Sequence, residues 1–294
     1  MSNVLFKYWI QAARPKTLLV SIAPVMMSLA IASIYIKINW LPAIICLVFA
    51  LMAQILSNFV NDYADGIKGA DNERLGPQRM VASGLIAPKQ MRSGIIIWSI
   101  LTFVLGCTLL YWGGLVLLPF GMVILLCALA YSTGPFPLSR HALGDVAVIL
   151  FYGITPVALT FFIQTGFVGW EIIIAGIAVG LVADNLLIVN NYRDVEEDVK
   201  YGKKTTVSLL GRPFMKTIFI CNPLIAILLG FVFLRNIINP LTWLVAIIPF
   251  LAYSIFVSMK FVKAEGMEFN RLIGMSSLEA VLYAITIVIA IIYI

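Results

Sequence analysis

Two clusters of acidic and amide side chains carry the chemistry that this sequence suggests. The first cluster contains Asn58, Asn61, Asp62 and Asp65, and Asp71 follows it. On a helix, Asn58, Asp62 and Asp65 would share one face, because they are separated by four and then three residues. Such a face presents several carboxylate and amide oxygens to one point.

A second cluster repeats this arrangement far along the chain. Asn191, Asp194 and Asp198 are separated by three and then four residues, so a helix would again place them on one face. Both clusters have the order Asn, then spaced Asp, then a basic segment that contains Gly; here that segment is 202–204. The match of Asp194 with Asp62 suggests an internal duplication.

Carboxylates that converge on one point repel each other unless a cation joins them. Mg²⁺ is a natural candidate, because it takes oxygen ligands and is commonly held by one or two carboxylates together with substrate phosphates. The predicted metal ligands are Asp62, Asp65, Asp71, Asp194 and Asp198. Basic side chains beside them would bind further phosphate oxygens. The predicted diphosphate ligands are Arg14, Asn58, Asn61, Lys68, Arg79, Asn191, Arg193 and Lys203.

Three further residues are candidates for the reaction itself. Asp184 precedes Asp194 by ten residues, about 15 Å of helix. It could form the floor of the cavity and bind an acceptor hydroxyl or take a proton, or it could simply be hydrogen-bonded to a neighbouring helix. Tyr131 is predicted to line the acceptor or carbocation pocket, and Glu279 is a weaker candidate inside the last helix. These acids are notable because ionisable groups inside a membrane are costly.

The composition identifies the elements that must position these side chains. Of 294 residues, 62% are hydrophobic and 12% are charged, whereas soluble domains are about 45–50% apolar and about 25% charged. This excludes a soluble enzyme, a disordered chain and a nucleic-acid binder. The apolar runs predict an all-α, polytopic membrane protein, with nine spans at 17–36, 41–62, 94–113, 115–133, 144–165, 171–192, 214–235, 239–258 and 273–294.

The basic residues predict the orientation of these spans. With nine spans, all but two of the 20 Lys and Arg residues fall on one side, and the exceptions are Lys37 and Arg235. The positive-inside rule then places the N-terminus in the cytoplasm and the C-terminus outside. Both acidic clusters lie at cytoplasmic helix ends. We therefore expect a multi-pass protein of a prokaryotic cell membrane, with its active-site mouth facing the cytoplasm.

The clusters also predict the domain plan. We expect a single domain over 1–294, built from two four-helix units at about 17–133 and 144–258 and an extra helix at 273–294. Membrane proteins built this way often place their site between the repeats. Carboxylates, Mg²⁺ and basic residues at the mouth suit a diphosphate, and an apolar cavity below would take a long tail. A polyprenyl diphosphate has both parts.

The motifs resemble those of the UbiA superfamily of intramembrane prenyltransferases. The segment 61–65, with Asp71 after it, is similar to the first Asp-rich motif of the superfamily, and 194–198 is similar to the second. Within the superfamily, the chain is most similar to the enzymes that prenylate 1,4-dihydroxy-2-naphthoate. That likeness rests on Arg14–Leu18 with Pro24, Arg74–Arg79 with Ser83-Gly84, Tyr131–Pro135 with Leu143–Asp145, and Asn190–Asp194 with Gly202–Thr205 and Leu210-Gly211. Tyr192 and Thr206 depart mildly from the subfamily pattern.

The resemblance implies a nine-helix bundle around a central cavity and a Mg²⁺-dependent C-prenylation. The polyprenyl group would pass from its diphosphate to dihydroxynaphthoate with loss of diphosphate and CO₂, which gives demethylmenaquinone. Cations would stabilise the leaving diphosphate. A dry pocket would protect the allylic carbocation from water, and aromatic faces would stabilise it.

Two alternatives stay open at this point. Another superfamily acceptor could replace dihydroxynaphthoate: 4-hydroxybenzoate, haem, a chlorophyll precursor or a prenylated glycerol phosphate. A secondary transporter is the rival from a different functional class, because duplicated units and buried acids suit both. Transporter sites lie near the bilayer midplane, whereas the polar clusters here lie at one side, which favours the enzyme.

Overall fold

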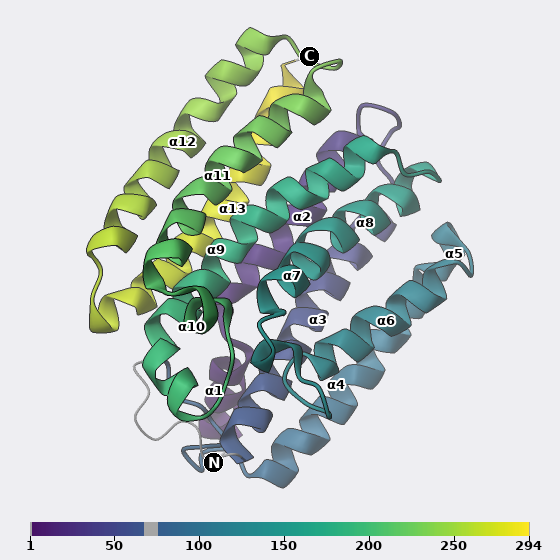
Figure 1. The fold of residues 1–294 in the computed structure, drawn as a ribbon. Coiled ribbons are helices and arrows are strands. Elements are labelled where there is room, and N and C mark those ends of the chain that lie inside the picture. The colour runs from purple at the N-terminus through teal and green to yellow at the C-terminus, as the bar shows by residue number, and fades with distance from the viewer. Residues whose placement is uncertain (1, 68–75, 294) are drawn as a thin grey trace.

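A computed structural model describes residues 2–67 and 76–293, and the regular elements in these ranges are all helices (Figure 1). In chain order they are α1 (Ser2–Ala13), α2 (Pro15–Ala32), α3 (Trp40–Ile67), α4 (Pro88–Thr108), α5 (Leu110–Gly113), α6 (Leu117–Ala130), η1 (Leu138–Arg140), α7 (Gly144–Ile149), η2 (Leu150–Ile154), α8 (Thr155–Thr165), α9 (Trp170–Lys200), α10 (Thr206–Leu210), α11 (Arg212–Leu234), α12 (Pro240–Lys263), η3 (Gly266–Glu268) and α13 (Phe269–Ile292).

Local sequence signals mark many of these boundaries. Pro15, Pro88 and Pro240 each stand at the first position of a helix, where the missing N–H costs nothing and the fixed φ suits the helix. Gly166 ends α8 in the left-handed region with φ 81°, a backbone conformation that glycine adopts without steric cost.

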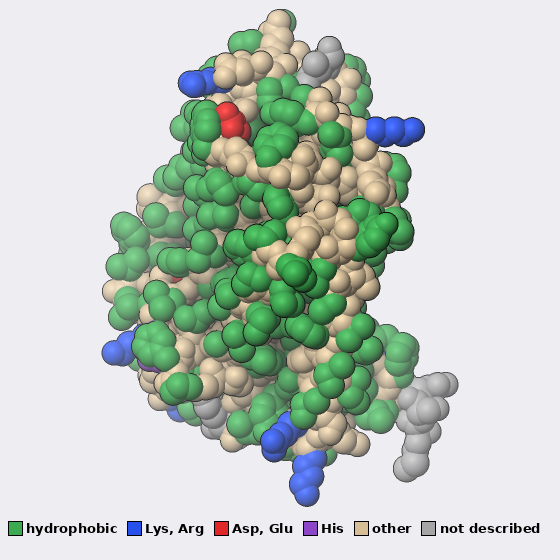
Figure 2. Space-filling model, turned by 90° about the vertical axis from the view of Figure 1, so that its right-hand side faces the viewer, with side chains coloured by type: hydrophobic (Ala, Val, Ile, Leu, Met, Phe, Trp, Pro, Cys, Tyr) green, Lys and Arg blue, Asp and Glu red, His purple; other side chains and the backbone are tan. Residues whose placement is uncertain are grey.

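Most of the long helices are apolar enough to cross a membrane. By length and composition, eight helical segments of the described ranges qualify. They match the predicted spans except the fourth, at 115–133, where α6 has only 14 residues. That helix is about 21 Å long, less than the roughly 30 Å of a bilayer core. The fourth span, and with it the total of nine, therefore stays a prediction, as does the orientation of the termini. On the face drawn in Figure 2, hydrophobic side chains cover the middle and Lys and Arg lie toward the two ends.

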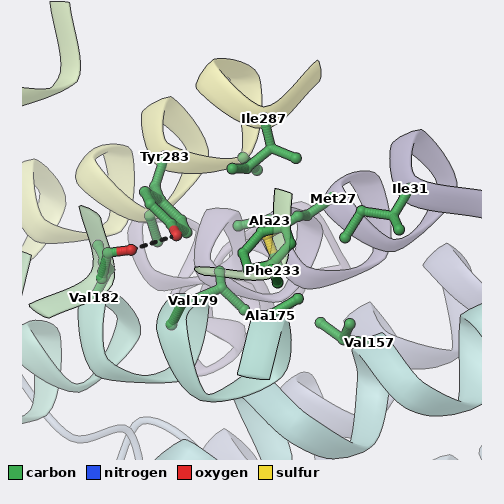
Figure 3. Close-up of a cluster of buried hydrophobic side chains, with 14 of the residues drawn as sticks. Ala23, Met27, Ile31, Val157, Ala175, Val179, Val182, Phe233, Tyr283 and Ile287 are labelled. Carbon is green, nitrogen blue, oxygen red and sulfur yellow. Dashed lines mark hydrogen bonds between the residues drawn. The ribbon is translucent and has the colours of Figure 1, made fainter. Parts of the chain in front are cut away.

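Helix α9 lies at the centre of the bundle. In its apolar window 67% of the residues are buried inside the protein, compared with 11% for α4. Helices α2, α11 and α13 pack around α9 and form the main core. The Tyr283 hydroxyl donates a hydrogen bond of 2.7 Å to the Ala226 carbonyl there. Figure 3 shows this cluster, which includes Ala23, Met27, Ile31, Val157, Ala175, Val179, Val182, Phe233 and Ile287.

Glycines allow the fifth predicted span to pack closely against α9. This span begins as α7, continues through the π-helix η2 and ends as α8. A Cβ atom built on Gly153 of η2 would lie 2.3 Å from the Gly176 carbonyl oxygen and 2.7 Å from the Gly180 Cα atom. The backbones therefore approach at a distance that only glycine permits. Single-turn π segments of this kind often occur at functional sites.

The two helices that carry the acidic clusters extend beyond their predicted ends. Helix α3 continues to Ile67 and α9 continues to Lys200, whereas the predicted spans ended at 62 and 192. Hydropathy marks where the apolar side chains stop, but the backbone hydrogen bonds of a helix continue through polar residues. Asp65, Asp194 and Asp198 are consequently helical residues held in fixed positions.

Candidate functional site

A large cavity lies among α2, α3, α4, α6, α7–α8 and α9. Its volume is about 530 Å³ and most of its lining is apolar; we call it the apolar cavity. Both Cys46 and Asn61 of α3 line it, and at about 1.5 Å per residue this stretch of α3 is about 22 Å long. The cavity is therefore long enough to hold an extended hydrocarbon chain.

A second, polar hollow adjoins the apolar cavity at its Asn61 end; we call it the polar cleft. The two share Asn61, Tyr131, Leu187 and Asn190 in their walls. Both acidic clusters reach the polar cleft, the first through Asn61 and Asp65 of α3 and the second through Asn191 of α9. The structure thus brings residues of both clusters to one cleft, although of the second cluster only Asn191 lines it.

Two ion pairs border the polar cleft, one from each cluster. Arg79 Nη2 lies 2.7 Å from Asp65 Oδ2, and Lys203 Nζ lies 3.0 Å from Asp198 Oδ1. The side-chain exposures are only 4% for Arg79 and 10% for Asp198. Pairs this enclosed interact strongly, because little water screens them. Each cluster thus brings one carboxylate and one cation to the same place.

Asp62 has a different role from Asp65 one turn later. Its two carboxylate oxygens accept hydrogen bonds from the backbone N–H groups of Met80 and Val81, at 3.0 and 2.9 Å. Asp62 is 2% exposed and lines neither cavity. These two bonds fold the segment 76–87 back onto α3, and they thereby bring Arg79 to Asp65.

Asp194 is the counterpart of Asp62 in the second cluster. Arg193 donates two hydrogen bonds to it, from Nε to Oδ1 at 2.6 Å and from Nη2 to Oδ2 at 2.7 Å. The same guanidinium donates to Asn190 Oδ1 at 2.8 Å and to Asn270 Oδ1 of α13 at 2.7 Å. Arg193 and Asp194 therefore tie α9 to α13, and neither lines the polar cleft.

The donor set around the polar cleft suits a hard divalent cation. Carboxylate and amide oxygens face it, and Mg²⁺ in proteins needs only one or two carboxylates when water and phosphates complete its shell. Within the described residues no three His, Cys, Asp or Glu side chains group as a metal cage. Predicted ligand Asp71 lies outside those residues. The fit is thus to a metal that is held jointly by protein and substrate.

Comparison with known proteins identifies the family. The model of the UbiA prenyltransferase family matches residues 21–271. The chain belongs to the UbiA prenyltransferase family. Together with the many apolar helices, this membership makes it a multi-pass membrane protein, as the sequence predicted.

Several UbiA-family relatives resemble this chain over most of its length. A 1,4-dihydroxy-2-naphthoate octaprenyltransferase of Haemophilus influenzae is 36% identical over 220 residues, which are 72% of this chain and 71% of the relative. An Escherichia coli protein of the same name is 33% identical and covers 69% of this chain and 68% of its own. The solved structure of a UbiA homolog from Archaeoglobus fulgidus bound to GPP and Mg²⁺ has a TM-score of 0.69, with 15% identity and coverage of 96% and 99%. That structure confirms the predicted all-helical, UbiA-like fold.

Three more of the predicted site residues, besides those of the ion pairs and amides above, lie in these walls. Tyr131 borders both the polar cleft and the apolar cavity. Asn58 and Arg14 line the apolar cavity near its polar end, and Asn58 Nδ2 donates to the Ala13 carbonyl at 2.9 Å. Arg14 precedes α2 in a left-handed conformation with φ 55°, which is strained for a residue with a Cβ atom. Predicted ligand Lys68 lies outside the described residues.

The two deeper acids lie behind the cavity walls. Asp184 is 3% exposed, borders Asn222 and lines neither cavity. Glu279 is 0% exposed, and Asn185 Nδ2 donates to its Oε2 at 3.4 Å. Both acids belong to a polar network between α9, α11 and α13. A role for Asp184 or Glu279 in substrate contact stays a prediction.

Sequence reasoning missed several polar residues of the site, among them Asn190, Asp145 and Asn270. Asn190 and Asp145 line the polar cleft, and Asn270 lines the apolar cavity while bonding to Arg193. Asp145 lies in the stretch Leu143–Asp145 that resembles the family, but it belongs to neither acidic cluster, so no role was predicted for it. Asn190 was the detectable one, because it directly precedes the clustered Asn191 in a polar run.

Proposed function

We propose that this chain is a Mg²⁺-dependent 1,4-dihydroxy-2-naphthoate polyprenyltransferase. The observation that carries the proposal is the junction of two unlike spaces: a polar cleft with two carboxylate–cation pairs opens onto an apolar cavity about 22 Å long. A polyprenyl diphosphate would fit the junction with its head in the cleft and its tail in the cavity.

The ion pairs of the cleft suit this substrate because they can exchange partners. Asp65 and Asp198 would hold Mg²⁺, with the amides of Asn61 and Asn191 nearby, and the metal would neutralise charge on the departing diphosphate. Arg79 and Lys203 would then bind the phosphate oxygens that the carboxylates leave to them. Asp62 and Asp194 would support the metal site mainly by fixing the backbone and Arg193 around it.

The apolar cavity would supply what the carbocation requires. Its lining is mostly apolar and would bind little water. This matters because a carbocation that reacts with water is lost as the alcohol. Tyr131, at the wall shared by both spaces, would lie beside the carbon that loses diphosphate, where its ring can stabilise positive charge. The electron-rich ring of the acceptor would attack that carbon and lose CO₂, which gives demethylmenaquinol, the hydroquinone form of demethylmenaquinone.

The domain plan and the location in the cell complete the proposal. Clusters on α3 and α9 meet at one cleft, which supports the duplicated plan of 17–133 and 144–258 with an extra final helix. The distribution of Lys and Arg supports a cytoplasmic N-terminus, an external C-terminus and a cleft that faces the cytoplasm of a prokaryotic cell.

An acceptor panel tests the proposed function. Membranes containing the protein would receive Mg²⁺, labelled polyprenyl diphosphate and one acceptor at a time: dihydroxynaphthoate, 4-hydroxybenzoate, haem, a chlorophyll precursor or a prenylated glycerol phosphate. We expect label to enter the naphthoate product only. Transfer to another acceptor alone would reassign the substrate, and uptake of a solute without any transfer would indicate the transporter alternative.

A further inference from the structure

Asp145, in the first turn of α7, is a cleft residue with an unused oxygen. Thr206 Oγ1 donates a hydrogen bond of 2.8 Å to Asp145 Oδ2. The other oxygen, Oδ1, is buried and has no hydrogen-bond partner in the part of the chain that the structure describes. A buried acceptor without a donor destabilises the folded protein, and a charged one does so more strongly. The carboxylate is therefore fixed on one side and open on the other.

The charges of the cleft indicate which kind of group would bind Asp145 Oδ1. The cations Arg79 and Lys203 each form an ion pair with another acid, Asp65 or Asp198. Asp145 forms no ion pair among the described residues, and it belongs to no group of three acids that could hold a metal there. A neutral donor such as a hydroxyl satisfies one carboxylate oxygen without disturbing these pairs.

The position of Asp145 is beside the expected reaction centre. A Cβ atom built on the preceding Gly144 would lie 3.3 Å from the Tyr131 hydroxyl. Tyr131 stands where the polar cleft meets the apolar cavity. The reacting carbon of the prenyl group must lie at that junction, because its diphosphate occupies one space and its tail the other. The acceptor ring must approach the same point.

We propose that Asp145 Oδ1 binds a ring hydroxyl of the aromatic acceptor and takes its proton during prenyl transfer. This inference rests on the proposed function. The O–H electron pair moves into the ring, the hydroxyl oxygen becomes a carbonyl, and the ring carbon that carries the carboxylate bonds to C1 of the prenyl group. The C1–O bond breaks and its electron pair leaves with the diphosphate. When the ring loses CO₂, the electron pair of that bond returns to the ring, and the carbonyl oxygen recovers the proton from Asp145.

Other ionisable groups act on Asp145 and must be considered in any pH profile. Tyr131 and Asp184 interact with it electrostatically, and Asp65 and Lys203 line the same cleft. Arg79 lines this cleft as well. Asp145→Asn removes the charge with which Tyr131 and Asp184 interact, so the pH profile of the variant can also shift through these neighbours. The assignment to Asp145 therefore requires both selective loss of transfer and its recovery at high pH.

The test separates ionisation of the prenyl diphosphate from transfer to the ring. With Mg²⁺ and no acceptor, slow release of diphosphate to water reports the first step alone. For Asp145→Asn we expect this release to be within about threefold of the parent, while transfer falls by about 10²–10⁴-fold, the usual contribution of a general base. Raising the pH should recover transfer in the variant as the acceptor hydroxyl ionises unaided. Glu196→Gln, the same chemical change at an exposed acid of α9, is the matched control and should leave both rates unchanged.

Three results would overturn the inference. Transfer by Asp145→Asn within about threefold of the parent would exclude a base at this position, because a general base contributes about 10²-fold or more. An equal loss of diphosphate release and transfer would place Asp145 in diphosphate or metal binding. Selective loss of transfer that high pH does not relieve would make it a positioning residue. Absence of Mg²⁺-dependent release in the parent would instead refute the proposed function.

Discussion

Replacing Asp62 by alanine should release the segment that brings Arg79 to the site. Asp62 accepts two backbone hydrogen bonds, from Met80 at 3.0 Å and from Val81 at 2.9 Å. Bonds to a charged group contribute about 1.5–3 kcal/mol each. Losing both should destabilise the folded-back segment 76–87 by about 3–6 kcal/mol, which raises its opening equilibrium about 10²–10⁴-fold at roughly 1.4 kcal/mol per factor of ten.

Hydrogen exchange of the peptide containing Met80 and Val81, followed by mass spectrometry in detergent micelles, measures this opening. Asp65→Asn is the matched control one turn along α3, since Asp65 bonds the Arg79 side chain rather than the backbone. We expect both variants to lose transfer activity, but only Asp62→Ala to lose protection at Met80 and Val81. Unchanged protection in Asp62→Ala would refute the anchoring role and would leave Asp62 as a metal ligand alone.

Three further predictions follow from the site and the packing. Gly153→Ala should lower the free energy of unfolding by about 1–3 kcal/mol by overpacking, because its Cβ would meet the Gly176 backbone. Thermal unfolding measures this. The control is Gly121→Ala, where the added Cβ meets nothing within 4 Å. Lys203→Ala should raise KM for the prenyl diphosphate about tenfold or more, because one hydrogen bond to a charged group is lost. Lys204→Ala changes the exposed neighbouring lysine and should leave KM nearly unchanged. Equal effects of the two variants would argue against a specific phosphate contact. EDTA should abolish transfer and Mg²⁺ should restore it, and turnover that survives chelation would exclude the metal role.

The sequence was informative wherever a pattern is local. Apolar runs predicted the long helices, and the repeated Asn-and-Asp spacing predicted that α3 and α9 would present acids to one place. The N-terminal helix α1 was missed because it is short and precedes Pro15, so it carries no spanning signal. The predicted helix ends at 62 and 192 were too early because hydropathy does not report backbone hydrogen bonding.

Contacts between distant segments could not be predicted in this way. Nothing in the local sequence of Asp62 indicates that the N–H groups of Met80 and Val81 return to it. The diphosphate role predicted for Arg193 likewise took no account of Asn270, which lies on another helix. The stretch Leu143–Asp145 resembles the family, but an acid at the start of α7 is equally typical of one that stabilises a helix N-terminus, and only the structure places Asp145 in the cleft.

The finite length of the apolar cavity bears on which tails the protein can accept. An extended chain advances about 3.5 Å for every three bonds, so the 32 main-chain bonds of an eight-unit isoprenoid reach roughly 37 Å. The stretch of α3 from Cys46 to Asn61 accounts for about 22 Å. A fully stretched octaprenyl group would therefore be roughly 15 Å longer than this wall of the cavity, so its far units would have to fold back or extend beyond it. The enzyme that builds the diphosphate, rather than this one, would then determine how many isoprene units the quinone carries.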